Sequence, residues 1–366
     1  MTQEGLEKFI IKQGWSMFGI VPFEVARKNL EKHEKVFQKW IENGFGADMD
    51  YLKKMQKDRY HPERKLADVK SVIVLGANYY SGDNSRDNSE DNRPINGPNN
   101  SPFNCGKVAR YARGRDYHKI LKKKLIELSD FLKFENPQAE TYVSVDSRPS
   151  VDRVLAECAG LGFFGKNTCI IDPSRESFFF IASVLTNLDL KPTEVRHMPN
   201  CGDCQKCINF CPTGALVAPG VLDARKCISY LTIENKGGIP ENLRSKIGNR
   251  IFGCDACQEV CPFNVGRAHK QQITIDKLKL EYGKGDCLDL CEIFLIKSDD
   301  EFTKKFAGTP LMRAKRRGLL RNACVVAGNS GNTMLIPHLE QFIKSTSDEM
   351  LAEHATWAIL KLKNLK

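Results

Sequence analysis

Eight cysteines between positions 201 and 261 have the spacing that binds iron–sulfur clusters. In the first group, three thiols recur every third residue and a fourth cysteine is followed by proline, as in bacterial ferredoxins. The second group supplies three thiols, its last cysteine again precedes proline, and Cys227 between the groups is the natural eighth ligand. The fourth cysteine of such a run ligates the other cluster. The expected ligands are Cys201, Cys204, Cys207 and Cys261 for cluster one, and Cys211, Cys227, Cys254 and Cys257 for cluster two.

Structural zinc is the alternative for this segment, because pairs of cysteines two residues apart also bind zinc. Zinc requires neither the proline after the last cysteine of each group nor three evenly spaced thiols. We therefore predict two 4Fe–4S clusters, close enough for electrons to pass between them. Such a segment is a one-electron relay, and a relay needs a terminus where chemistry occurs.

Six further cysteines bring the total to 14. We expect a cytoplasmic protein, because residues 1–12 lack an export signal and no run of eighteen apolar residues could span a membrane. The cytosol keeps thiols reduced, so the six are predicted to be small buried hydrophobic residues rather than disulfides. They are Cys105, Cys158, Cys169, Cys287, Cys291 and Cys324.

Positive charge is concentrated near the C-terminal end of the chain, whose net charge is +10. Residues 302–322 include seven basic side chains and no acidic one. A solvated helix face normally mixes both signs, so this stretch favours a polyanion partner such as nucleic acid. An ordinary charged surface is the alternative.

Alternating helix and strand patterns over the first 190 residues predict an α/β layered domain, within an overall α/β or α+β fold. Strands are expected over 71–79, 141–145, 168–171 and 177–185, and helices over 6–12, 25–43, 119–134 and 150–160. The Asn- and Asp-rich stretch 81–104 reads as a mobile insertion. Three consecutive helices follow the cluster segment, at 311–327, 333–343 and 349–362. The predicted domains are 1–195, 196–270 (ferredoxin-like) and 271–366 (helical).

The usual termini of an electron relay have no clear motif here. Residues 160–165 have the letters Gly-x-Gly-x-x-Gly, but they follow a predicted helix instead of a strand, so they do not indicate a dinucleotide site. Asp116 and His118 begin like a cobalamin-binding Asp-x-His-x-x-Gly motif, but position 121 is leucine. His118 is therefore not expected to ligate cobalt.

Several motifs together resemble the epoxyqueuosine reductase family. The segment 145–153 around Asp146 and the segment 156–168 come first, and the double cluster motif follows. Supporting motifs are 110–118, 253–258, 313–322 with 328–329, and 354–358, so the resemblance extends from about 53 to 362. The insertion after Tyr80 and the Ser147–Arg148 pair depart from the family pattern.

This resemblance implies a cobalamin-dependent reductase that removes the epoxide oxygen from epoxyqueuosine at the wobble position of transfer RNA. It implies that the N-terminal α/β domain binds cobalamin (B12) without an Asp-x-His motif. A HEAT-like helical repeat at the C-terminal end, a monomeric state and an unidentified electron donor such as a flavodoxin or ferredoxin are also expected.

Asp146 is the expected proton donor for the oxygen that leaves the epoxide. This task needs an acid that stays protonated near neutral pH through partial desolvation. Asp146 ends a predicted strand, where ligand-facing residues of α/β sheets lie. The same position also suits a helix N-cap, although Ser147 or Ser150 could serve equally. The family motif assigns catalysis to Asp146.

Other residues are expected to contact the cofactor or the RNA. Arg59, Asp146, Lys166 and Asn167 are predicted cobalamin contacts. For Arg59, Lys166 and Asn167 the alternative is a solvated charge or a plain loop. The resemblance places Arg153 at the RNA, whereas position alone suggests a surface ion pair with Asp152 or Glu157. The predicted phosphate contacts are Lys315, Arg316, Arg317 and Arg321. Base identity would be read in a pocket around a flipped wobble nucleotide.

Two other classes of protein share parts of this pattern. A respiratory reductive dehalogenase combines cobalamin with two clusters, but it is exported and lacks a basic helical tail. A non-catalytic electron carrier would not need some 190 residues upstream of its clusters. Iron, cobalt and corrin analysis of the purified protein separates the three classes.

Overall fold

The computed structural model describes residues 2–79, 104–146, 150–195, 198–265, 275–279 and 282–364. The predicted insertion at 81–104 lies outside these residues except for Asn104, and so does the pair formed by Ser147 and Arg148. Within the described ranges, no helix is both long and apolar enough to cross a bilayer.

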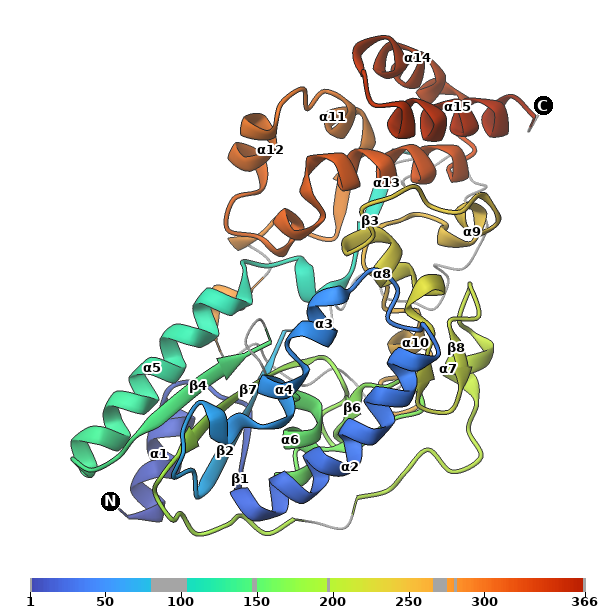
Figure 1. Ribbon diagram of the computed structural model, residues 1–366. Coiled ribbons are helices and arrows are strands. Elements are labelled where there is room, and N and C mark those ends of the chain that lie inside the picture. Colours follow the sequence, from blue (N-terminus) through green and yellow to red (C-terminus); the bar gives the residue numbers. More distant parts are fainter. Residues whose placement is uncertain are drawn as a thin grey trace.

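A four-stranded sheet forms the centre of the N-terminal region (Figure 1). Its strands lie in the order β1 (Met17–Pro22), β2 (Ser71–Asn78), β7 (Phe179–Thr186) and β4 (Thr141–Val145). Every neighbouring pair is antiparallel. The region is therefore an α+β fold, which corrects the expected α/β layering. β1 was not predicted, because glycine and proline weaken its strand pattern.

Helices cover both faces of this sheet (Figure 1). One face packs against α1 (Gln3–Lys12) and α5 (Tyr117–Glu135). The other face packs against α2 (Phe23–Glu42) and α6 (Asp152–Cys158). With both faces covered, every residue of β2 is buried, which explains its continuous apolar sequence.

Short elements connect these layers to the site. They are α3 (Asp50–Lys54), α4 (Gln56–Tyr60), η1 (Pro62–Arg64), η2 (Arg110–Ala112), β5 (Phe163–Phe164) and β6 (Ile170–Ile171). Gly19 in β1 allows the end of α6 to approach the sheet, because a Cβ atom there would lie 2.0 Å from the Ala159 carbonyl oxygen.

A second sheet joins segments from all three predicted domains. Its central strand β3 (Cys105–Val108) pairs in parallel with β10 (Arg250–Phe252) and antiparallel with β11 (Cys287–Asp289). One hydrophobic core contains Val108, Ile251 and Leu288 from these strands together with residues of the C-terminal helices. The three predicted regions therefore share one sheet and one hydrophobic core, and they are not independently packed domains.

The cluster segment is built from short elements between ligand loops. They are α7 (Lys206–Asn209), β8 (Leu216–Ala218), β9 (Val221–Leu222), η3 (Ala224–Lys226), α8 (Ile228–Ile233), α9 (Glu241–Ile247) and α10 (Ala256–Glu259). A further short turn, η4 (Asp276–Leu278), follows this segment.

The C-terminal end is helical, as predicted, and lies at the opposite end of the molecule from the N-terminus (Figure 1). Its elements are α11 (Leu290–Phe294), α12 (Asp299–Phe306), η6 (Pro310–Ala314), α13 (Lys315–Asn329), η7 (Thr333–Leu335), α14 (Ile336–Ser345) and α15 (Glu349–Lys363). The three predicted helices are present as α13, α14 and α15, the first two each preceded by a 3-10 turn. A HEAT-like repeat stays a prediction.

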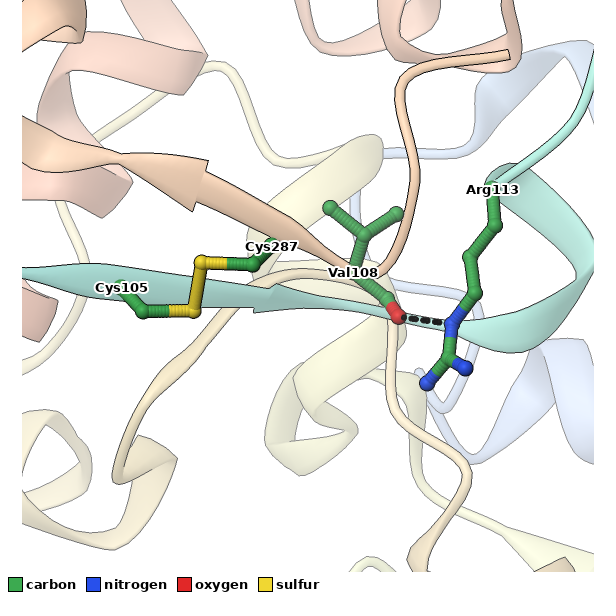
Figure 2. The surroundings of a disulfide bond; sticks show 4 residues. All are labelled: Cys105, Val108, Arg113 and Cys287. Atoms are coloured by element: carbon green, nitrogen blue, oxygen red, sulfur yellow. Dashed lines mark hydrogen bonds between the residues drawn. A yellow bond between two sulfur atoms is a disulfide. The ribbon is translucent and has the colours of Figure 1, made fainter. Parts of the chain in front are cut away.

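Cys105 and Cys287 form a disulfide between the paired strands β3 and β11 (Figure 2). The prediction that both are buried thiols is wrong for this pair. The two residues are 182 positions apart, and only the strand pairing brings their Cα atoms to 5.5 Å. Of the remaining four, Cys324 is buried as predicted, whereas Cys158, Cys169 and Cys291 are partly exposed.

Alkylation of the unfolded, unreduced protein tests this disulfide. We expect a linked peptide that contains Cys105 and Cys287, and we expect Cys105→Ser to release Cys287 for alkylation. Loss of the link should lower the free energy of unfolding by up to about 5 kcal/mol. Cys158→Ser is the control, because its thiol has no disulfide partner. Full alkylation of both residues in the wild type would contradict the assignment.

Candidate functional site

Asp146 lies in the turn between β4 and α6. It follows β4 directly, its φ is +32°, and its backbone N–H donates to Asp152 Oδ2 at 3.2 Å. A positive φ is uncommon for a residue with a side chain and is often found at functional sites. The sequence predicts Asp146 at an edge where the ends of parallel strands meet. The sheet is antiparallel and has no such edge, so the turn after β4 positions the carboxyl group instead.

Two side chains from the first turn of α5 contact the Asp146 carboxylate. Tyr117 donates its hydroxyl to Asp146 Oδ2 at 2.6 Å, and His118 Nε2 lies 3.5 Å from the same oxygen. Asp116 caps this helix by accepting the backbone N–H of His118, and its Oδ1 lies 2.7 Å from His118 Nδ1. The result is a row of acid, imidazole and acid: Asp116, His118, Asp146.

The contacts within this row shift the pKa values of Asp146 and His118 in opposite directions. Desolvation by the surrounding protein raises the pKa of Asp146. Hydrogen bonds from His118 and Tyr117, together with the charges of His118 and Arg153, lower it by more, so the pKa of Asp146 is about 2. Burial by itself lowers the pKa of His118, but Asp116 and Asp146 raise it to about 9. At neutral pH an Asp146 carboxylate therefore faces a His118 imidazolium.

This charge state corrects the expectation that desolvation keeps Asp146 protonated. The Asp146 side chain is 64% exposed, so water supports its ionised form in addition to its hydrogen-bond donors. If Asp146 donates a proton, it must first receive one. From the sequence, His118 was considered only as a ligand for cobalt. Its contact with an acid could have been predicted, because Asp116 lies two residues before it at the start of a predicted helix.

Aromatic side chains from other elements surround this carboxylate. Burial, followed by the charge of Asp146, raises the pKa of Tyr111 in η2. Burial is the main cause of the raised pKa of Tyr51 in α3, and the charge of Asp146 adds to it. The Arg313 guanidinium lies 5.8 Å from the centre of the Tyr51 ring. The site therefore lies where the sheet region and the C-terminal region meet.

Arg153 and Arg59 approach the same turn from α6 and α4. Arg153 donates to the Thr168 carbonyl at 3.0 Å, and its charge acts on Asp146. This hydrogen bond differs from the ion pair with Asp152 or Glu157 that position alone suggested. Arg59 has a buried Nε without a hydrogen-bond partner in the described part of the chain. Burial raises the pKa of Asp152 to about 6, and the charge of Arg59 opposes that shift.

The cluster cysteines fall into two groups in space. Burial raises the pKa of Cys261, and the thiols of Cys201 and Cys207 add to this effect. Burial likewise raises the pKa of Cys254 to about 12, with a contribution from Cys227. Such coupling requires proximity, and it joins members of the sets expected for cluster one and cluster two.

Hydrophobic packing shows the same division. Cys261 packs with Cys201, and Cys227 and Cys254 pack together against a different core. Among the described residues, no group of three or more His, Cys, Asp or Glu side chains has the arrangement that a single metal ion requires. The assignment of individual ligands stays a prediction.

The loop after β5 contacts ligand loops of both clusters. The Lys166 backbone N–H lies 3.4 Å from Cys201 Sγ, and its ammonium donates to the Gly202 and Cys204 carbonyls at 2.6 and 2.9 Å. Buried Asn167 donates to the Cys257 carbonyl at 3.2 Å. Both side chains therefore contact the cluster loops, and the expectation that Lys166 and Asn167 contact cobalamin stays a prediction.

Cys169 is a further residue near cluster two that the sequence analysis missed. Cys257 lowers the pKa of its thiol, and Cys169 in turn raises the pKa of Cys257, so the two thiols lie close together. Cys169 lies three residues after Lys166 in no recognisable motif, so its place near Cys257 could not be predicted from the sequence.

Arg321 is not available to an RNA phosphate. It is 1% exposed, and its guanidinium donates to the Asn235, Gly237 and Leu231 carbonyls at 2.5–2.7 Å. Its neighbour Asn322 donates to the Thr232 and Ile251 carbonyls. The predicted phosphate contact of Arg321 is therefore wrong. The residue attaches α13 to the cluster segment.

Acidic residues from distant segments neutralise most of the remaining basic stretch. Their pairs are Lys305 with Glu292, Arg313 with Glu234, Arg316 with Asp299, and Arg317 with Asp348. Lys315, at the start of α13, is exposed. Residues 302–322 contain no acidic residue, but acidic side chains from other segments lie beside them in the folded protein. The surface formed by this stretch is therefore less positively charged than expected.

Sequence comparison identifies related proteins. The family model described as epoxyqueuosine reductase QueG matches residues 59–147, and a 4Fe-4S double cluster binding domain matches residues 200–264. The chain is 39% identical over 344 residues to the epoxyqueuosine reductase of Francisella cf. novicida (strain Fx1), covering 92% of this chain and 91% of that protein.

Solved structures of the same name share the fold. An epoxyqueuosine reductase from Bacillus subtilis, described with its catalytic aspartate loop swung out of the active site, has a TM-score of 0.80 and 30% identity and covers 98% of this chain and 90% of its own. An epoxyqueuosine reductase with an epoxyqueuosine-modified tRNA-Tyr stem loop has a TM-score of 0.74 and 28% identity, with coverage of 99% and 98%.

The hydrogen bonds of Lys166 predict an effect on cluster one. Replacing Lys166 by Met removes a positive charge and two bonds to the ligand loop, so the reduced, more negative cluster is less stabilised. We expect its midpoint potential to fall by several tens of millivolts in a redox titration followed by electron paramagnetic resonance. Lys246→Met is the control, because Lys246 is an exposed lysine of α9 that does not lie beside a cluster cysteine. Equal shifts in both variants, or none in Lys166→Met, would contradict this role.

Burial of Arg321 predicts a loss of stability. Arg321→Met leaves three buried carbonyls without their donor, so the free energy of unfolding should fall by at least about 3 kcal/mol. The control Lys315→Met should change it by less than about 0.5 kcal/mol. Urea unfolding followed by circular dichroism measures both variants. A wild-type value for Arg321→Met would show that its contacts contribute little.

Proposed function

This chain belongs to the epoxyqueuosine reductase family, a family of oxidoreductases, and we propose that it reduces epoxyqueuosine to queuosine at the wobble position of transfer RNA. The observation that carries the proposal is the Asp146 carboxylate held by Tyr117 and His118 in a chain that also contains the double-cluster domain. The relative solved with a modified stem loop supports the choice of substrate.

The reaction requires electrons and protons in equal number. Removing an epoxide oxygen to leave an alkene consumes two electrons and two protons and releases one water molecule. Cobalamin, when bound, would supply the reducing centre that opens the C–O bond. The eight cluster cysteines would hold two one-electron carriers. An external donor such as a flavodoxin or ferredoxin would supply the electrons.

Asp146 is the proposed last carrier of the proton. Its exposed carboxylate accepts the hydroxyl hydrogen of Tyr117 and lies near the charge of Arg153. A group in this place can deliver a proton to the oxygen as the first C–O bond breaks, so that a neutral hydroxyl and not an alkoxide forms on the neighbouring carbon. Tyr117 would orient the carboxyl oxygen, and Arg153 would contact the substrate.

Arg59 is the proposed cobalamin contact. Its buried Nε has a hydrogen to donate and no acceptor among the described residues, which suits the amide or phosphate oxygens of a corrin tail. Lys166 and Asn167 are better assigned to the cluster loops, because their donors already have acceptors there.

The proposed RNA contacts are Arg153, Lys315, Arg316 and Arg317. The ion pairs of Arg316 and Arg317 involve side chains with substantial exposure. Exposed pairs contribute little stability, so both arginines could exchange a carboxylate for a phosphate. These contacts would orient the stem loop without reading its sequence. We further propose that the protein acts as a monomer in the cytoplasm. Its proposed regions are 1–195 for cobalamin binding and catalysis, 196–270 for the two clusters and 271–366 for RNA binding.

Replacing Asp146 by Asn tests the proton donor. The variant should retain about eight irons and one cobalt per chain, but it cannot carry a carboxyl proton, so turnover should fall roughly 100-fold or more. Turnover is the conversion of an epoxyqueuosine-modified stem loop, measured by mass spectrometry of its nucleosides. The control Asp130→Asn alters an exposed carboxylate of α5 and should leave turnover unchanged. Near-normal turnover by Asp146→Asn would refute the role of Asp146.

A further inference from the structure

We propose that His118 acts through Asp146 as a positioning and proton-supplying residue: it returns a proton to the Asp146 carboxylate in each turnover, and Asp116 holds its ring in place. This inference rests on the proposed function, because it takes Asp146 as the final proton donor.

Contacts on both sides fix the His118 ring. Asp116 Oδ1 lies 2.7 Å from Nδ1 and also accepts the backbone N–H at 3.1 Å, so one carboxylate positions both the helix start and the imidazole. The ring stacks on Tyr117 at 4.1 Å between centroids, and Tyr117 stacks on Phe180 of β7 at 4.0 Å. In this orientation Nε2 faces Asp146 Oδ2.

The charges around His118 favour an imidazolium. It lies at the N-terminus of α5, where the helix dipole disfavours a cation. Two carboxylates outweigh that effect and burial, and they raise the pKa of His118 to about 9. The other titratable groups near this row are Tyr51 from α3, Tyr111 from η2 and Asp152 and Arg153 from α6, at the Asp146 end, and Lys119 from α5, at the Asp116 end.

Neither neighbouring acid fits the supply of protons as well as His118. Tyr117 is closer to Asp146, but burial and then the charge of Asp146 raise its pKa, so the phenol donates a hydrogen bond and retains its proton. Asp152, whose pKa is about 6, directs Oδ2 to the backbone N–H of Asp146 and not to its carboxyl group.

The proton transfers balance without any redox change at His118. As the C–O bond breaks and the epoxide oxygen becomes strongly basic, the Nε2 proton of the imidazolium passes through the Asp146 carboxyl group to that oxygen. A neutral imidazole bonded to Asp116 remains, and Asp146 ends the step as the carboxylate. His118 regains a proton from water. Each turnover uses this route once for the departing oxygen, and solvent supplies the second proton of the released water.

A His118→Gln variant tests the proposal on the holoenzyme, with reduced methyl viologen as electron source and a modified stem loop as substrate. We expect normal iron content and an unchanged KM, with maximal turnover reduced about 10- to 100-fold at neutral pH and above. Wild-type turnover should fall as pH rises through about 9, where His118 loses its proton, and the variant should lack this limb. Added imidazole should restore part of its turnover. His338→Gln, an exposed histidine, is the control that should match the wild type.

Three outcomes would overturn the relay. They are a wild-type rate and pH profile in His118→Gln, a loss that is equal at every pH and is not rescued by imidazole, and an alkaline limb that persists in the variant. Asp146→Asn separates this failure from failure of the proposed function. If Asp146→Asn is inactive while His118→Gln behaves as wild type, only the relay is refuted. If Asp146→Asn is active, the assignment of Asp146 fails and the relay fails with it.

Discussion

The pairing of β3 with strands from two distant segments is the constraint on which the site depends. β3 is followed directly by η2 and then by Asp116, Tyr117 and His118, so fixing this strand also fixes the start of α5. The backbone N–H of Arg110 donates to Asp255 Oδ2 at 2.8 Å, within the ligand loop that contains Cys254 and Cys257. The N–H of Asp116 donates to the Gly308 carbonyl at 2.8 Å in the C-terminal region. One connection thereby ties the acid row to a cluster loop and to the helices.

Charged side chains in this protein are organised by partners that are remote in sequence. Arg321 is enclosed by carbonyls of residues 231–237, and Arg244 forms a bidentate pair with Glu353. These buried guanidinium groups satisfy backbone oxygens at the junction between the cluster segment and the helices, where an unpaired carbonyl would be costly. The same residue type therefore serves two purposes: arginines with exposed pairs remain candidates for RNA, and enclosed arginines hold regions together.

The acid row shows how one fold separates proton affinities over a few ångströms. Asp146 directly follows β4 and Asp152 begins α6, yet the pKa of the first is about 2 and that of the second about 6. Hydrogen-bond donors and an imidazolium surround Asp146, whereas burial dominates at Asp152. Pairs of groups whose environments push their pKa values apart are typical of acid–base sites. The carboxyl group in contact with solvent, Asp146, is the stronger acid of the two.

The sequence by itself determined the parts of this protein that depend on local spacing. The cysteine runs with their prolines predicted a double-cluster segment, and the motif around Asp146 indicated the family that the comparisons support. The apolar period predicted strands β2, β4 and β7 and the helices α13 to α15, because each pattern is written within one short segment. Tertiary structure alone decided what depends on partners far along the chain. It made the sheet antiparallel, joined Cys105 to Cys287 across 182 residues, buried Arg321, and turned Lys166 toward the cluster loops. It also set the charge of Asp146, because a pKa is fixed by neighbouring dipoles and charges in space, and His118 and Tyr117 reach that carboxylate only when α5 packs beside β4.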